Sequence, residues 1–411
     1  RGDTLEYNND FERRRAYISS REKMRKRRRT VYLTILFMVL AALFLLVGGG
    51  ILIKKHGGLP GLAKKETETS SDPSSGNGDT NVSLAESGSD GDASSETPSS
   101  TALTAAYNTG DAALDEILNS AHAKFVTYDY DAALEILNSA TDYAENEDVK
   151  ALIASCEETK ATLVPADVNK ITHIFFHSLI MDNSKAFDGD ADEKGYDQVM
   201  TTKSEFLKIL DSMYAKGYVL VKLHDIAHEE TDENGNAKMV PGTILLPPGK
   251  IPFVMSQDDL CYYEYMTGDG FASRMIVGED GKPTCEMVMD DGSVSVGSYD
   301  LVPLLEDFIA EHPDFSYHGR KGILAMTGYD GVLGYRTDGA YKSKKNLQDD
   351  QKAFLKANPD FDYNKEVKAA KKVAKAMKKD GWEFASHTWG HRNATSSTAA
   401  ELKTDNKKWE K

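Results

Sequence analysis

The longest apolar stretch of the chain predicts a membrane-spanning helix. Residues 31–53 contain no charged side chain. At about 1.5 Å per residue, a helix of this length crosses a hydrocarbon core of about 30 Å. A buried globular helix this long would carry a polar face, and the apolar core of a cleaved signal peptide is shorter. The pattern therefore predicts one transmembrane helix at residues 30–53.

Residues 54–104 have the opposite pattern and predict a disordered linker. The segment is rich in Ser, Gly and Asp, and residues 66–101 hold eight acidic side chains and no basic one. Such a stretch cannot bury enough apolar surface to offset the entropy lost on ordering. We expect it to act as a flexible tether.

Helical spacing of apolar residues returns in residues 105–165. The strings at 111–121 and 131–140 are near copies, with Tyr128-Asp129-Tyr130 between them. This arrangement resembles a tetratricopeptide-type helical hairpin. Only about one and a half repeats are present, fewer than a stable solenoid needs, so we expect a short helical neck closed by Pro165.

From residue 170 onward, strand-like and helix-like patterns alternate, which predicts an α/β fold. The apolar periodicity places helices at 204–216, 301–310 and 366–379. Strands are expected at 171–176, 218–221, 251–255, 322–326 and 382–385.

Charge is distributed unevenly and sets the expected topology. Residues 1–65 carry 15 Lys and Arg against five acidic residues, a net charge of +10, whereas residues 66–411 carry a net −26. Seven of these cations lie at 21–29, directly before the apolar span. Positive charge stays cytoplasmic, so we expect a single-pass cell-membrane protein with a basic cytoplasmic tail at 1–29 and an extracellular remainder.

Composition also excludes several classes of protein. The overall net charge of −16 argues against nucleic acid as a partner, because phosphate binding requires clustered cations. The three cysteines, Cys156, Cys261 and Cys285, are far apart and odd in number. They form neither a disulfide scaffold nor a CxxC metal knuckle.

Two predicted strands are followed by side chains of the types that bind metal ions in proteins. The strand at 251–255 leads into Asp258-Asp259, and the strand at 382–385 leads into His387 and His391. Residues four apart share one face of a helical turn, so we expect both imidazoles to point at one ion. One carboxylate and two imidazoles leave a divalent metal with open positions, and the second carboxylate can act as a base.

These residues resemble the polysaccharide deacetylase family (NodB homology, carbohydrate esterase family 4). The family's opening strand and Tyr-His correspond to Phe176-His177, and its Gly-Tyr strand corresponds to Gly217-Tyr218. Its first motif, Thr-Phe-Asp-Asp-Gly, appears as residues 256–260, and His-Ser/Thr-x-x-His appears as residues 387–391.

The resemblance implies a distorted (β/α) barrel in residues 170–411 that removes acetyl groups, N-acetyl in preference to O-acetyl, from a cell-wall or surface glycan such as peptidoglycan. It implies a divalent metal, Zn²⁺ first and Co²⁺, Ni²⁺ or Mn²⁺ as alternatives. The residue roles that it implies are Asp258 as general base, Asp259, His387 and His391 as metal ligands, and His177 and Trp389 as residues lining the site.

The first motif departs from the family pattern at two positions. Gln257 replaces Phe and Leu260 replaces Gly. The long spacing to His387 implies an insertion at about 261–300. Within it, Asp290-Asp291-Gly292 offers an alternative first motif, but a hairpin turn explains it more simply. We therefore prefer Asp258 and Asp259.

The two ends of the sequence carry further expectations. The family's later motifs, Arg-x-Pro-aromatic and a Leu-x-x-His that supplies the general acid, do not follow His391. The last helical run, from 398, has no C-terminal cap. We therefore expect the sequence to be a fragment truncated at its C-terminus, and the initial Arg1 indicates that an N-terminal part is missing as well.

Three functions remain open at this stage. The leading hypothesis is a membrane-anchored extracellular deacetylase of an acetylated polysaccharide. The alternative is a catalytically inactive carbohydrate-binding or envelope scaffold protein, a reading that Gln257, Leu260 and the missing motifs favour. A third is that the helical neck recruits a protein partner. The enzyme hypothesis requires Asp259 to lie within metal-bridging distance of both histidines.

Overall fold

The computed structural model describes residues 107–190 and 192–410. The predicted basic tail, the transmembrane helix and the whole linker lie outside these residues. Within them, no helix is both long enough and apolar enough to cross a membrane.

Three α-helices and a short 3₁₀ segment form the neck. They are α2 (Ala112–Val126), α3 (Tyr130–Ser139), η2 (Thr141–Tyr143) and α4 (Glu147–Thr162). The near-copied strings correspond to α2 and α3. Asp111 accepts hydrogen bonds from the N–H groups of Ala113 and Leu114 and thereby begins α2. The three α-helices share one small apolar core that includes Leu118, Leu137 and Leu152.

The turn between α2 and α3 is fastened to the α/β region. Tyr128 adopts φ +67°, and its hydroxyl donates to the carbonyl of Asp314 at 2.7 Å. The N–H of His318 donates to the carbonyl of Thr127 at 2.7 Å, and the Tyr128 ring stacks on Tyr317. The neck therefore packs on the α/β region through buried aromatic side chains.

A parallel sheet of five strands forms the centre of the α/β region. They are β2 (Thr172–Phe176), β3 (Tyr218–Leu220), β7 (Ile251–Asp258), β11 (Ile323–Met326) and β12 (Glu383–Ser386). The order is β12-β11-β7-β2, and β3 also pairs with β7. Six of the eight residues of β7 are buried, as expected for a central parallel strand covered on both faces.

The mixed α/β architecture with a parallel sheet is confirmed. The family resemblance also implies the more specific arrangement of a distorted barrel. The strands within residues 107–190 and 192–410 form an open path with β2 and β12 at its ends, so they do not close a barrel.

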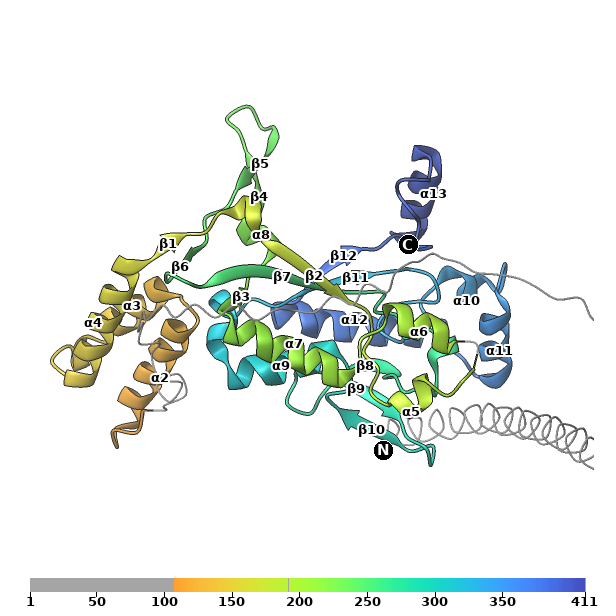
Figure 1. The fold of residues 1–411 in the computed structure, drawn as a ribbon, viewed down its shortest axis with the longest axis horizontal. Helices are drawn as coiled ribbons and strands as arrows, with labels where there is room; N and C mark the ends of the chain where they lie inside the picture. Colours follow the sequence, from red (N-terminus) through yellow and green to blue (C-terminus); the bar gives the residue numbers. More distant parts are fainter. Residues whose placement is uncertain (1–106, 191, 411) are drawn as a thin grey trace, which may run out of the picture. The chain divides into compact units, whose positions relative to one another are not determined.

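Three amphipathic helices cover one face of this sheet: α7 (Lys203–Ala215), α9 (Leu301–Glu311) and α12 (Tyr363–Lys379) (Figure 1). Their apolar sides, including Phe206, Leu305 and Val373, join Phe253 and Leu324 of the sheet in the largest core. On α7, Thr202 and Glu205 form a capping box, and the helix is followed by Gly217 at φ +78°.

The predicted insertion folds as a three-stranded antiparallel sheet of β8 (Arg274–Val277), β9 (Pro283–Val288) and β10 (Val294–Gly297), preceded by η4 (Glu264–Met266). An exposed hairpin of β4 (Ala227–Thr231) and β5 (Ala237–Pro241) precedes the central strand β7. The short strands β1 (Val164–Pro165) and β6 (Leu245–Leu246) pair with each other.

The remaining elements are short helices. They are η3 (Val168–Lys170), α5 (Asn183–Ala186), α6 (Glu193–Val199), α8 (Leu223–Ile226), η5 (Pro313–Phe315), η6 (Tyr317–Gly319), α10 (Gly339–Ser343), α11 (Asp349–Ala357) and α13 (Ala399–Trp409).

Candidate metal centre

Asp259 lies directly after the central strand, at the carboxyl edge of the parallel sheet. Its backbone adopts φ +53°, a left-handed conformation that costs energy in a non-glycine residue. Its N–H donates to the carbonyl of Ala325 in β11 at 3.0 Å. The neighbouring strand thus holds the turn in which this carboxylate is presented.

The two histidines lie on an irregular loop after β12, so the expectation of a helical turn was wrong. Thr388 and His391 adopt φ +65° and +49°, which curl the chain in a way that an α-helix cannot. The buried carboxylate of Asp405, on α13, accepts hydrogen bonds from the N–H groups of Trp389 and Gly390. A side chain from a later helix therefore fixes the loop shape in place of helical hydrogen bonds.

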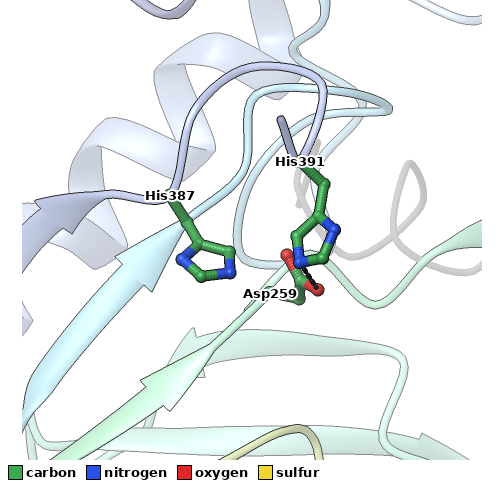
Figure 2. Close-up of side chains that lie close together, drawn as sticks. All are labelled: Asp259, His387 and His391. Atoms are coloured by element: carbon green, nitrogen blue, oxygen red, sulfur yellow. Dashed lines mark ion pairs between the residues drawn. The ribbon is translucent and has the colours of Figure 1, made fainter. Parts of the chain in front are cut away.

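This loop brings both imidazoles to Asp259 (Figure 2). One ligand atom from each of Asp259, His387 and His391 lies within 4.8 Å of the other two. His391 Nε2 is 3.6 Å from Asp259 Oδ2, and the imidazole centroids are 4.9 Å apart. The structure thus brings together the three residues that the sequence predicted as ligands.

The donor set suits a divalent cation. Ligand atoms about 2.1 Å from one ion in tetrahedral geometry lie about 3.4 Å from one another. The 3.6 Å separation of His391 Nε2 and Asp259 Oδ2 is close to this value. The ligand atoms of all three residues lie at most 4.8 Å apart, and rotation of the side chains can bring them to the distance that a shared ion requires. The His391 side chain is 62% exposed and has room to rotate. Two imidazoles and one carboxylate leave open coordination positions, as in catalytic zinc sites.

Asp258, the predicted base, ends β7 and is half-buried. Its Oδ1 accepts a hydrogen bond from the hydroxyl of Ser256 at 3.1 Å, and that hydroxyl lies 3.0 Å from His173 Nε2. Because a hydroxyl has a single proton, donation to Asp258 requires that His173 donate to Ser256. Neither His173 nor Ser256 was predicted to have a role. In the β2–β7 register His173 pairs with Val254, two residues before Ser256, so the two side chains lie on the same face of the sheet.

The other predicted site residues lie in different surroundings. His177 is half-buried, and its Nδ1 is 3.2 Å from the carbonyl of Val199. Asp290 and Asp291 are exposed in the turn between β9 and β10, where Lys185 pairs with Asp290. None of these three side chains belongs to the group around Asp259.

Both departures from the family motif point into the protein core. Gln257 is fully buried, and its Nε2 donates to Asp300 Oδ2 at 2.7 Å. Asp300 Oδ2 also accepts from the hydroxyl of Tyr262 at 2.6 Å. Leu260 is fully buried in the main core. These substitutions change how the turn is anchored and leave Asp259 next to the histidines.

Aromatic side chains extend away from the candidate centre. The hydroxyl of Tyr263 lies 3.5 Å from Asp259 Oδ1, and its ring stacks on Tyr265 at 5.5 Å. Tyr263 also contacts Tyr329, which meets Trp389 edge to face at 5.9 Å. Burial and, to a smaller extent, the charge of Asp259 raise the pKa of Tyr265 to about 12, so its hydroxyl is protonated at neutral pH.

Comparison with protein families supports this interpretation of the C-terminal segment. Residues 360–411 match the family model described as Polysaccharide deacetylase. This C-terminal segment is therefore similar to part of the polysaccharide deacetylase family. The matched segment includes α12, β12, both histidines and α13. Neither a comparison with curated proteins nor one with solved structures gave a match.

The carboxylates of the candidate metal centre lie outside the matched segment, because Asp259 precedes it by about a hundred residues. Spatial proximity is therefore the evidence that connects Asp259 with the histidines. Asp405, which fixes the histidine loop, had no recognisable signal in the sequence, because an aspartate in a helix of mixed polarity is ordinary.

Proposed function

We propose that this chain is a membrane-anchored, extracellular, metal-dependent deacetylase of a cell-wall or surface glycan. The proposal rests above all on the convergence of Asp259, His387 and His391, which belong to segments 128 residues apart. The family match at 360–411 supports deacetylation. The apolar span at 30–53 and the preceding cations support a membrane anchor.

The chain's own residues have distinct roles in this proposal. Asp259, His387 and His391 hold the cation, with Zn²⁺ as the first expectation. When bound, a divalent cation supplies an acidified water and stabilises negative charge on the acetyl oxygen. Asp258 accepts a proton from the attacking water, and Ser256 orients the carboxylate of Asp258. N-acetyl groups are the preferred substrate.

The decisive experiment separates proton transfer from metal binding. In Asp258→Asn, zinc measured by equilibrium dialysis is expected to stay near one per chain, while deacetylation of an acetylated glycan falls about 10²- to 10⁴-fold. His387→Ala is expected to lose both zinc and activity. Asp290→Asn, which alters an exposed carboxylate in the hairpin turn, is the matched control and should change neither.

Two results would contradict this proposal. Full activity in Asp258→Asn removes the assignment of the base. Substoichiometric zinc in the unmodified chain, together with retained glycan binding, favours a catalytically inactive carbohydrate-binding protein.

A further inference from the structure

Beside the histidine loop lies an open pocket of about 800 Å³, within the size range of ligand sites. It is bordered by residues of α10, α11, α12 and α13. We name it the lysine pocket, because its lining includes Lys342, Lys345, Lys371 and Lys408. The same lining contains four aromatic residues, Tyr329, Tyr363, Trp389 and Trp409.

The lysine pocket is connected to the candidate metal centre by a shared residue. Trp389 lines the pocket and lies between His387 and His391 in the loop. Its carbonyl accepts a hydrogen bond from the N–H of Tyr329, a second lining residue, at 2.8 Å. A polymer that occupied this pocket would therefore pass alongside the histidine loop.

The charge of the lining contrasts with the charge of the chain. Four lysines and one carboxylate, Asp338, line the pocket of a protein whose net charge is −16. Asp338 is buried and accepts hydrogen bonds from the N–H groups of Ala340 and Asp330. Burial raises the pKa of Asp338. In the lining itself lysines therefore outnumber carboxylates four to one, while the carboxylate of Asp350 lies 3.4 Å from the Tyr329 hydroxyl at its border.

Two of the lysines are placed beside aromatic rings. Lys408 Nζ lies 3.8 Å from the centroid of the Trp389 ring, and Lys342 Nζ lies 5.6 Å from that of Tyr363. Within the described part of the chain, no salt bridge joins any of the four lysines to a carboxylate. Their ammonium groups can therefore pair with a ligand without first breaking an internal ion pair.

This combination matches the chemistry of a charged sugar polymer. The C–H faces of sugar rings pack on aromatic rings, whose faces carry partial negative charge. An anionic substituent on the same sugar pairs with an ammonium group. Lysine recognises charge as a point and lacks the planar fork of arginine, and the pocket lining contains no arginine. Such a lining accepts carboxylate and phosphate alike.

We propose that the lysine pocket binds an anionic glycan and that the substrate of this domain carries negative substituents near the acetylated sugar. This inference rests on the proposed function, since it identifies the substrate class of the same site.

Binding in the presence of a chelator tests the inference without relying on catalysis. Calorimetry on the full chain compares a neutral N-acetylglucosamine tetramer with a tetramer of alternating N-acetylglucosamine and glucuronic acid. A 6-phosphorylated N-acetylglucosamine tetramer distinguishes phosphate from carboxylate. We expect either anionic ligand to bind about tenfold more tightly than the neutral one at about 50 mM salt, and about 500 mM salt should remove most of this preference.

Substitutions locate the effect. The Lys342→Gln/Lys371→Gln double variant should bind the anionic tetramers within about twofold of the neutral one. Lys372→Gln is the matched control, because Lys372 is an exposed neighbour of Lys371 on α12 and does not line the pocket. It should leave all affinities unchanged within about twofold.

The outcomes separate this inference from the proposed function. Equal affinity for neutral and anionic tetramers would overturn the proposal that the lysine pocket binds an anionic glycan, and so would an equal loss of anionic affinity in Lys372→Gln. Either result would do so even if the metal-loaded chain deacetylates a neutral glycan. Salt-sensitive anionic binding that the double variant abolishes supports the pocket. It does so even if the metal-loaded chain hydrolyses none of the tetramers, a result that counts against the proposed function alone.

Discussion

Asp300→Ala tests whether a buried carboxylate anchors the turn that presents Asp259. Asp300 is fully buried at the start of α9. Its Oδ1 accepts from the N–H groups of Leu179 and Leu301 at 2.9 and 2.8 Å. Its Oδ2 accepts from side chains on both sides of the turn, Gln257 and Tyr262. Truncation leaves these four donors without their acceptor.

The magnitude follows from the balance of two effects. Each buried donor left unpaired costs about 1–3 kcal/mol, which gives about 4–8 kcal/mol for four donors at the lower part of that range. Removing a buried carboxylate recovers several kcal/mol of desolvation. We therefore expect Asp300→Ala to lower the free energy of unfolding by about 3 kcal/mol. Since the turn loses its anchor, zinc affinity should fall about tenfold.

Asp300→Asn provides the matched comparison. It keeps an oxygen for the two backbone donors and places an amide opposite Gln257 and Tyr262. Because the Tyr262 hydroxyl can rotate to accept from this amide, the expected loss is about 1–2 kcal/mol.

Urea denaturation followed by tryptophan fluorescence measures the free energy of unfolding of both variants. The signal reports on the α/β region, because that region contains all three tryptophans, Trp382, Trp389 and Trp409. A loss below about 1 kcal/mol in Asp300→Ala, or equal losses in the two variants, would refute the anchoring role.

Three further expectations follow from the same structure. Burial raises the pKa of Asp300 above its value in the unfolded chain, so folding favours the protonated form. The free energy of unfolding, measured by urea titration at several pH values, should therefore fall as the pH rises from the ordinary Asp pKa through the raised one. Asp300→Asn should lack this slope. Tyr128→Phe removes a buried hydrogen bond between the neck and the α/β region and should cost about 1 kcal/mol in denaturant titrations. Tyr143→Phe removes an exposed hydrogen bond to Asp111 within the neck and should cost less than about 0.5 kcal/mol. Gly328→Ala places a Cβ 2.7 Å from Trp389 Cδ1, so the ring must move, and a zinc titration should show about tenfold weaker binding; unchanged binding would mean that the histidine loop tolerates this shift.

Periodicity in the sequence was sufficient to predict the elements that carry the candidate site. The amphipathic spacing at 366–379 anticipated most of α12, and the apolar run at 251–255 anticipated the core of β7. Both signals are local, because they reflect which side of an element faces the core. The hairpin of β4 and β5 was not anticipated, although Asn234-Gly235 in its loop is a strong turn signal.

Interactions between distant residues could not be predicted in the same way. His-x-x-x-His is compatible with a helical turn and with a curled loop, and Asp405 selects the loop by binding the N–H groups of Trp389 and Gly390. Asp300 was missed for the same reason. One indirect signal was present: Gln257 closely follows the apolar run at 251–255, and a buried amide requires a partner. That partner is 43 residues away, at the end of the insertion.

The two adjacent carboxylates can take different roles only if the backbone separates them. Side chains alternate between faces along β7, so Asp258 shares a face with Ser256 while Gln257 points to Asp300. If the strand continued through Asp259, that carboxylate would follow Gln257 toward the core. The left-handed φ of +53° at Asp259, held by the hydrogen bond to Ala325, ends the alternation and places its carboxylate 3.6 Å from His391 Nε2. Backbone strain at Asp259 is therefore what allows one carboxylate to face the histidines while its neighbour stays with Ser256, the division that the proposed reaction requires.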